Sequence, residues 1–177
     1  MNEFTLDLET IRARAREHIS QGAVTAAYGA DRAQVIKVLN DVLATEIVCV
    51  LRYQNHHFMA KGLLGVAAAA EFLAHAKEEQ AHVDLVAKRI AQLGGVPNFD
   101  PNGLHQRSHS QYTEGKTLDD MIRDNLIAER VAIATYSELV RWLGNRDATT
   151  RVMIEGLLAT EEEHASDLAT VLIRVGQ

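Results

Sequence analysis

The sequence predicts an all-α fold, an antiparallel four-helix bundle with a long crossover between its second and third helices. Three observations lead to this prediction. Alanine, leucine, glutamate and arginine are frequent and the two prolines lie close together, a composition that favours helix over sheet. Four long segments carry apolar residues at helical spacing. Two of the three connections between them are short, and 177 residues suffice for one sizeable core.

The first two helices are predicted at 31–61 and 66–93. Gly62 stands where a helix commonly ends, one residue past its last turn. The second helix is stopped by the sequence Gly-Gly-Val-Pro that begins at Gly94. The segment that follows, up to residue 116, is rich in turn-forming residues and predicts the long crossover.

The last two helices are predicted at 117–143 and from about residue 147 almost to the C-terminus. Thr117, with Asp120 three residues later, resembles a capping box, and Gly144 ends the third helix. Short connections favour antiparallel neighbours. We therefore predict a bundle over residues 31–177. Residues 1–30 are predicted to be an N-terminal extension with a short amphipathic helix over 8–20.

Charge and composition exclude several classes of function. The net charge of −6 argues against a nucleic-acid-binding surface, so DNA binding is not expected. The single cysteine, Cys49, cannot form an intrachain disulfide, and the start of the chain lacks an apolar stretch behind basic residues. Both observations predict a cytoplasmic protein. No apolar run is long enough to span a bilayer, so no membrane partner is expected.

On each predicted helix the apolar residues form a stripe along one face. Each stripe is interrupted near its middle by a carboxylate, and two stripes also carry a histidine. A buried ionised carboxylate is costly unless it is paired or bound to metal. Four of them in one core would repel one another, and a pair of divalent cations removes that repulsion. The predicted ligands on the stripes are Glu46, Glu79, His82, Glu129, Glu161 and His164.

The spacing of these residues fits a two-metal site. Glu-x-x-His occurs twice and places both side chains on one helix face. Tyr53 and Tyr136 each lie seven residues after a predicted glutamate ligand, about two helical turns on the same stripe. We predict that both hydroxyls bond ligand carboxylates. Carboxylate and imidazole ligands suit iron or manganese, with zinc as a competitor.

Other polar residues near the stripes receive ordinary interpretations. Glu78, Glu162 and Glu163 point away from the stripe by their angular positions, so they are expected to be solvated. His56, His57 and His75 are expected to be surface or boundary residues.

At these residues the chain resembles the ferritin-like superfamily, and bacterioferritin most closely, over about residues 35–173. The order Glu, Glu-x-x-His, Glu, Glu-x-x-His agrees with that family, and Tyr53 matches a tyrosine near its di-iron site. The resemblance implies that Glu79 and Glu161 bridge two irons. It also implies that Glu46 with His82, and Glu129 with His164, are terminal ligands.

Two departures from bacterioferritin change the expectation. Gln80 stands where bacterioferritins carry a haem-ligating methionine, so haem is not expected. Only 13 residues follow His164, too few for the fifth helix of bacterioferritin. In this respect the chain is similar to Dps-like proteins, and a 12-subunit homo-oligomer is favoured over a 24-subunit one.

The resemblance implies a ferroxidase that binds two irons per subunit and oxidises Fe(II) with O2 or H2O2 for iron storage or detoxification. One alternative is another di-metal enzyme on the same fold, a rubrerythrin-like peroxidase or a manganese catalase. A second alternative, from a different class, is a metal-free helical interaction protein.

Overall fold

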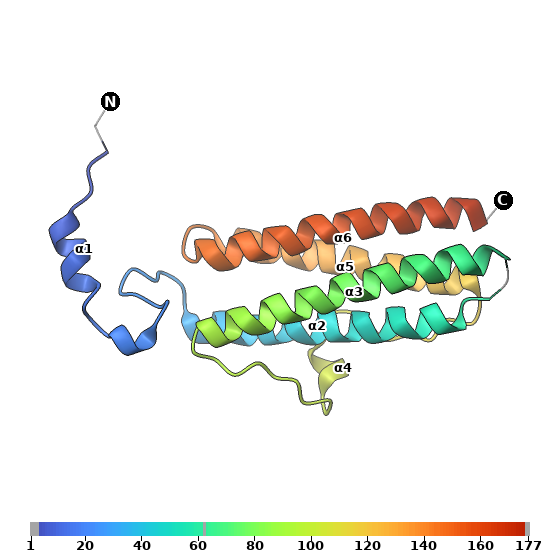
Figure 1. Cartoon of the computed structure of the whole chain (residues 1–177), viewed down its shortest axis with the longest axis horizontal. Coiled ribbons are helices and arrows are strands. Elements are labelled where there is room, and N and C mark those ends of the chain that lie inside the picture. The colour runs from blue at the N-terminus through green and yellow to red at the C-terminus, as the bar shows by residue number, and fades with distance from the viewer. Residues whose placement is uncertain (1–3, 62, 176–177) are drawn as a thin grey trace.

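The computed structural model describes residues 4–61 and 63–175, and these residues form helices without any strand. Figure 1 shows the long helices running side by side, with α1 beyond one end of them. The elements in chain order are α1 (Leu8–Arg14), the 3-10 helix η1 (Ile19–Gln21), α2 (Arg32–Met59), α3 (Leu63–Gln92), α4 (Leu104–Arg107), α5 (Leu118–Leu143) and α6 (Ala148–Val175).

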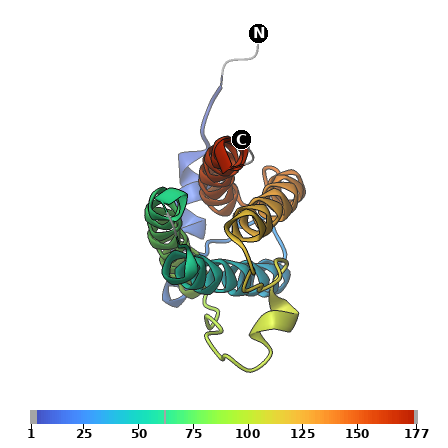
Figure 2. The same cartoon turned by 90° about the vertical axis from the view of Figure 1, so that its right-hand side faces the viewer.

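The long helices α2, α3, α5 and α6 form the bundle, and every packed pair is antiparallel (Figures 1 and 2). Short connections join α2 to α3 and α5 to α6. The segment between α3 and α5 instead runs the whole length of the bundle and includes α4. The predicted fold class is therefore confirmed, crossover included. No helix among the described residues is long and apolar enough to cross a membrane.

Local signals in the sequence set most helix boundaries. The Asp31 side chain accepts a hydrogen bond from the Gln34 amide and caps α2. Thr117 and Asp120 form the predicted capping box of α5. At the other end of α5, Gly144 takes a positive φ of 50°.

Three predicted boundaries differ from the structure. The second bundle helix begins at Leu63, three residues before its predicted start. The first bundle helix ends at Met59 with Ala60 as its cap, and Gly62 lies outside the described residues. The predicted N-terminal helix over 8–20 was too long, because α1 ends at Arg14. His18 takes a left-handed φ of 48°, which an α-helix cannot accommodate, and η1 follows it.

The end of the predicted N-terminal extension packs on the bundle. Val24, Tyr28 and Ala30 contact the main apolar cluster. The Tyr28 hydroxyl donates a 2.8 Å hydrogen bond to Asp147, whose other carboxylate oxygen lies 2.9 Å from Arg89. This buried ion pair therefore ties the segment before α2 to the end of α3 and the start of α6. The division of the chain at residue 30 stays a prediction.

The core consists of two apolar clusters. The larger one fills one end of the bundle and includes Val42, Ile90 and Leu157. The smaller one fills the other end and includes Phe72, Ile122 and Leu168. The predicted ligands lie at helix positions between these clusters, so apolar side chains close the polar layer from both ends.

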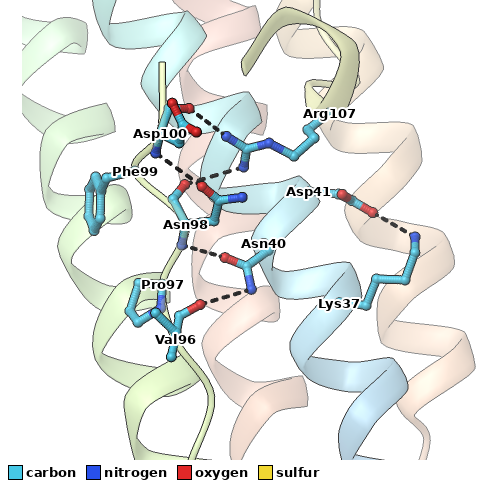
Figure 3. Close-up of a pocket in the computed structure, with 9 residues that line it drawn as sticks. All are labelled: Lys37, Asn40, Asp41, Val96, Pro97, Asn98, Phe99, Asp100 and Arg107. Carbon is cyan, nitrogen blue, oxygen red and sulfur yellow. Dashed lines mark hydrogen bonds and ion pairs between the residues drawn. The ribbon is translucent and has the colours of Figure 1, made fainter. Parts of the chain in front are cut away.

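The crossover begins on the surface of α2, where Asn40 holds it through its side-chain amide (Figure 3). Asn40 accepts a 2.7 Å hydrogen bond from the Asn98 amide and donates one to the Val96 carbonyl. Arg107 of α4 donates to the carbonyls of Asn98 and Asp100. These bonds give hydrogen-bond partners to backbone groups of Val96, Asn98 and Asp100, which lie outside the helices.

Further along the crossover, a buried arginine of α2 serves the same purpose. Arg52 donates hydrogen bonds of 2.8 Å to Asn125 and 3.1 Å to both Ser110 and the Gln111 carbonyl. Its side chain is fully buried, so these partners replace the water that a guanidinium would otherwise bind. The arginine thereby fastens the crossover to both α2 and α5.

We expect Arg52→Ala to lower the free energy of unfolding by about 2–4 kcal/mol, because it leaves Asn125 and Ser110 with unpaired buried groups. Thermal denaturation followed by circular dichroism measures the change. Arg130→Ala, at an exposed position on α5, is the matched control and should change stability by less than about 0.5 kcal/mol. Equal midpoints for the two variants would contradict this role of Arg52.

Candidate metal centre

All six predicted ligands meet in the centre of the bundle. Glu46 comes from α2, Glu79 and His82 from α3, Glu129 from α5, and Glu161 and His164 from α6; each is buried. Their potential ligand atoms form two groups, each with atoms within 4.8 Å of one another. One group contains Glu46, Glu79, His82 and Glu161, and the other contains Glu79, Glu129, Glu161 and His164. Glu79 and Glu161 belong to both groups.

The two histidines point the same ring nitrogen into the cluster. The Nδ1 atom of His82 lies 3.2 Å from Glu161, 3.3 Å from Glu46 and 3.4 Å from Glu79. The Nδ1 atom of His164 lies 3.4 Å from Glu161, 3.5 Å from Glu79 and 4.0 Å from Glu129. Glu79 and Glu161 thus approach both imidazoles, as bridging ligands would, whereas Glu46 and Glu129 approach one each.

The hydrogen bonds of this cluster are incomplete. Most of the buried side-chain atoms that lack a hydrogen-bond partner among the described residues lie here: both carboxylate oxygens of Glu79 and of Glu161, Oε2 of Glu129 and Nδ1 of His164. Orphaned acceptors are costly in an apolar core. Because the orphaned atoms are oxygen and imidazole nitrogen ligands, the set fits divalent iron, manganese or zinc.

Each tyrosine bonds the glutamate of the other half of the chain. Tyr53 of α2 donates to Glu129 of α5, and Tyr136 of α5 donates to Glu46 of α2. The seven-residue spacing predicted a carboxylate partner for both hydroxyls, and the structure provides one. It could not predict the exchange between halves, which arises because α2 and α5 pack antiparallel. These bonds hold one oxygen of Glu129 and one of Glu46 in place.

Burial divides the four carboxylates into two kinds. Burial, together with the charge of Glu79, raises the pKa of Glu46 to about 8. Burial and the charges of Glu79 and Glu161 also raise the pKa of Glu129 well above its usual range. Burial acts in the same direction on Glu79 and Glu161, but their close contacts with the two imidazoles outweigh it and lower both pKa values.

The imidazoles respond in the opposite sense. Burial alone would lower the pKa of His82, but the carboxylates of Glu161, Glu46 and Glu79 outweigh it and raise the pKa to about 12. The same balance raises the pKa of His164 to about 11. Before any cation binds, two imidazolium groups therefore face the ionised carboxylates of Glu79 and Glu161 at neutral pH. A cation that binds the imidazole nitrogens must displace their protons.

Glu78 is exposed, as predicted, but it also contacts a predicted ligand. Its side chain is 55% exposed, and Oε2 lies 2.6 Å from Nε2 of His164. The carboxylate fixes the ring so that Nδ1 points into the cluster. Angular position on its own helix could not reveal this bond, because the partner lies on α6.

The expectations for two of the outer histidines were wrong. His56 is buried and bonds Asn125 and the Thr113 carbonyl, so it belongs to the structure that holds the crossover. His75 is buried as well, and its ring stacks on that of His164 with centroids 4.0 Å apart. His57 is half-buried at the helix boundary, as expected. The apolar spacing around His56 and His75 gave no sign of neighbours on other helices.

Comparison with known proteins agrees with this architecture. Bacterioferritin of Mycobacterium leprae is 26% identical over 144 residues, which cover 81% of this chain and 86% of the relative. The nutrient stress-induced DNA-binding protein of a Synechococcus strain is 31% identical over 144 residues, which cover 78% and 81%. The dodecameric thioferritin of Bacteroides fragilis, a bacterioferritin-related protein, superposes with a TM-score of 0.80 at 30% identity, covering 84% of this chain and 89% of that one.

The family match extends over nearly the whole bundle. Residues 36–175 match the Ferritin family, described as a ferritin-like domain. This range includes every predicted ligand and both tyrosines that bond the ligand carboxylates. The chain belongs to the ferritin-like family.

Proposed function

We propose that this protein is a ferroxidase that takes up two Fe(II) ions per subunit and oxidises them for iron storage or detoxification. The observation that carries the proposal is the pair of overlapping ligand groups that share Glu79 and Glu161. Two groups with two shared carboxylates have the layout of a two-metal site with bridging ligands. The bacterioferritin relatives support iron as the metal.

The reaction uses Fe(II) as substrate and O2 or H2O2 as oxidant. Each of two Fe(II) ions loses one electron; O2 takes up both with two protons to give H2O2, or H2O2 takes up both with two protons to give two waters. Glu79 and Glu161 would hold the two ions at a fixed separation. Tyr53 and Tyr136 would keep Glu129 and Glu46 in place, and the apolar clusters would limit access of water.

The proposed assembly is a 12-subunit shell. Its support is the thioferritin of Bacteroides fragilis, which is 30% identical and is described as dodecameric. The absence of haem and of DNA binding, and a cytoplasmic location, stay predictions. Because the Synechococcus relative is named a DNA-binding protein, the prediction that this chain does not bind DNA should be tested by a mobility-shift assay with duplex DNA.

Fe(II) oxidation measured with O2 and with H2O2, together with native mass, tests the function. We expect two Fe(II) per subunit to be oxidised rapidly and ferric product to be retained in a species of about twelve subunits. A monomer or dimer with manganese-dependent catalase turnover and no ferric product would favour the manganese catalase alternative. Peroxide reduction without iron retention would favour the rubrerythrin-like one. No uptake of iron, manganese or zinc would leave the metal-free interaction protein.

Metal binding should release at least about three protons per pair of divalent ions at pH 7. Glu46 must ionise and His82 and His164 must each lose a proton, since their pKa values are about 8, about 12 and about 11. The raised pKa of Glu129 acts in the same direction and adds to the release. Anaerobic addition of Fe(II) in weakly buffered solution, followed by back-titration with base, counts the protons.

The sign of the pH dependence follows from the same groups. Because protons compete with the metal, affinity should rise as pH increases from 6 to 8, the range in which Glu46 approaches its pKa of about 8. Release of one proton or none, with affinity independent of pH, would mean that the metals bind elsewhere.

A further inference from the structure

A further group of residues that could bind a metal lies outside the six predicted ligands of the two-metal site, and the proposed reaction does not use it. Glu71 and His75 of α3 and Asp167 of α6 bring potential ligand atoms within 4.8 Å of one another. The two helices pack against each other along the bundle. The three residues form a gradient of exposure, since Asp167 is exposed, the Glu71 side chain is 37% exposed and His75 is buried.

The hydrogen bonds around His75 determine which ring nitrogen can bind a cation. Tyr53 donates its only hydroxyl hydrogen to Oε1 of Glu129. The Tyr53 oxygen is therefore an acceptor for Nδ1 of His75, 3.2 Å away, and that nitrogen carries the hydrogen of the neutral ring. Nε2 is then left with a free lone pair.

That lone pair faces a carboxylate rather than a donor. Nε2 of His75 lies 3.4 Å from Oε1 of Glu71, longer than an ordinary N–H···O hydrogen bond. With Asp167 in the same group, two carboxylates and one buried imidazole nitrogen converge, and all three are electron-pair donors. A divalent cation is the ligand that satisfies three such atoms at once.

We propose that Glu71, His75 and Asp167 form a third divalent-cation site, between α3 and α6 and beside the two-metal site. The proposal deepens the ferroxidase function and, in its role as a transit site for iron, depends on it. The His75 ring stacks on His164, a predicted ligand, with centroids 4.0 Å apart. Iron held there would lie one ring away from the two-metal site, with solvent on the side of Asp167.

Anaerobic calorimetric titration of the untagged, metal-free protein with Co(II) tests the site. The variant is Glu71→Gln/Asp167→Asn, which keeps side-chain size and leaves all six central ligands intact. The matched control, Asp84→Asn/Glu155→Gln, removes one exposed aspartate and one half-buried glutamate from the same two helices. We expect the variant to bind one Co(II) fewer per subunit than the wild type, and the control to equal the wild type. Circular dichroism confirms that both variants are folded.

The outcomes separate this site from the proposed function. Equal stoichiometry for the wild type and Glu71→Gln/Asp167→Asn would overturn the third site, while binding of two Co(II) by both would leave the two-metal proposal standing. Conversely, a wild type that binds a single Co(II), lost in the variant, would support the third site and count against the two-metal one. The same loss in the control variant would overturn the proposal, since it would show a general effect of surface charge.

Discussion

Glu79→Ala should reduce the rate of Fe(II) oxidation by at least about 100-fold. Removing hydrogen-bond partners of metal ligands already costs 10- to 100-fold in typical sites, and Glu79 is a proposed ligand to both metals. Its carboxylate lies within 3.5 Å of Nδ1 of both His82 and His164, so no neighbouring side chain duplicates its position. Stopped-flow absorbance of the ferric product after mixing with O2 gives the rate.

Asp84→Ala is the matched control for this variant. Asp84 lies on the same helix, five residues later, but is exposed and contacts only Gln80 by a side-chain hydrogen bond among the described residues. Its oxidation rate should equal that of the wild type. If Glu79→Ala oxidised Fe(II) as fast as Asp84→Ala, the two-metal site would have to lie elsewhere in the protein.

Two pairs of isosteric substitutions should have opposite effects on the metal-free protein. In Glu46→Gln/Glu129→Gln, each amide replaces a carboxyl group whose pKa is raised by burial, to about 8 for Glu46, and each amide can still accept from its tyrosine. The free energy of unfolding should change by less than about 1 kcal/mol. Glu79→Gln/Glu161→Gln removes the ionised partners of two buried imidazolium groups, and should cost at least about 3 kcal/mol.

The pH dependence gives the sign of this effect. The pKa values of His82 and His164 are raised in the folded state, to about 12 and about 11. Their contribution to stability is therefore complete below pH ~6.5 and is lost as pH rises towards those values. The difference between the two double variants should be largest in neutral to mildly acidic solution and shrink at high pH.

Thermal denaturation of the metal-free protein measures the stability of both double variants. All samples are compared at one subunit concentration, because assembly affects the midpoint. Both should bind metal poorly, since each lacks two of the predicted ligands. Only Glu79→Gln/Glu161→Gln should also shift the imidazole titrations towards ordinary histidine values by NMR. Equal destabilisation of the two pairs would contradict the assignment of protons within the cluster.

Much of this architecture could be predicted from local patterns. The bundle helices follow from apolar stripes of 3.6-residue period, and the start of α5 follows from Thr117 and Asp120. The six predicted ligands could be recognised because an ionised carboxylate buried on an apolar stripe is energetically costly unless it is paired or bound to metal. Their meeting in the folded chain agrees with that reasoning, and their role as ligands stays a prediction.

The features that the sequence missed all depend on contacts between helices. The bond between Glu78 and His164 could not be predicted, because His164 lies on α6. His75 looked like a boundary residue because the rings that enclose it, Tyr53 and His164, lie on two other helices. Arg52 carries no local sign that it is buried against the crossover.

Helical periodicity is sufficient to predict the fold class, the long helices and the set of residues that meet in the polar layer, because it fixes which side chains share a face. The packing of the helices sets which tyrosine bonds which glutamate and which carboxylates approach both imidazoles, and it brings Glu71, His75 and Asp167 together. The physical reason is that these relations depend on the order, direction and axial offset of packed helices, which no single helix encodes.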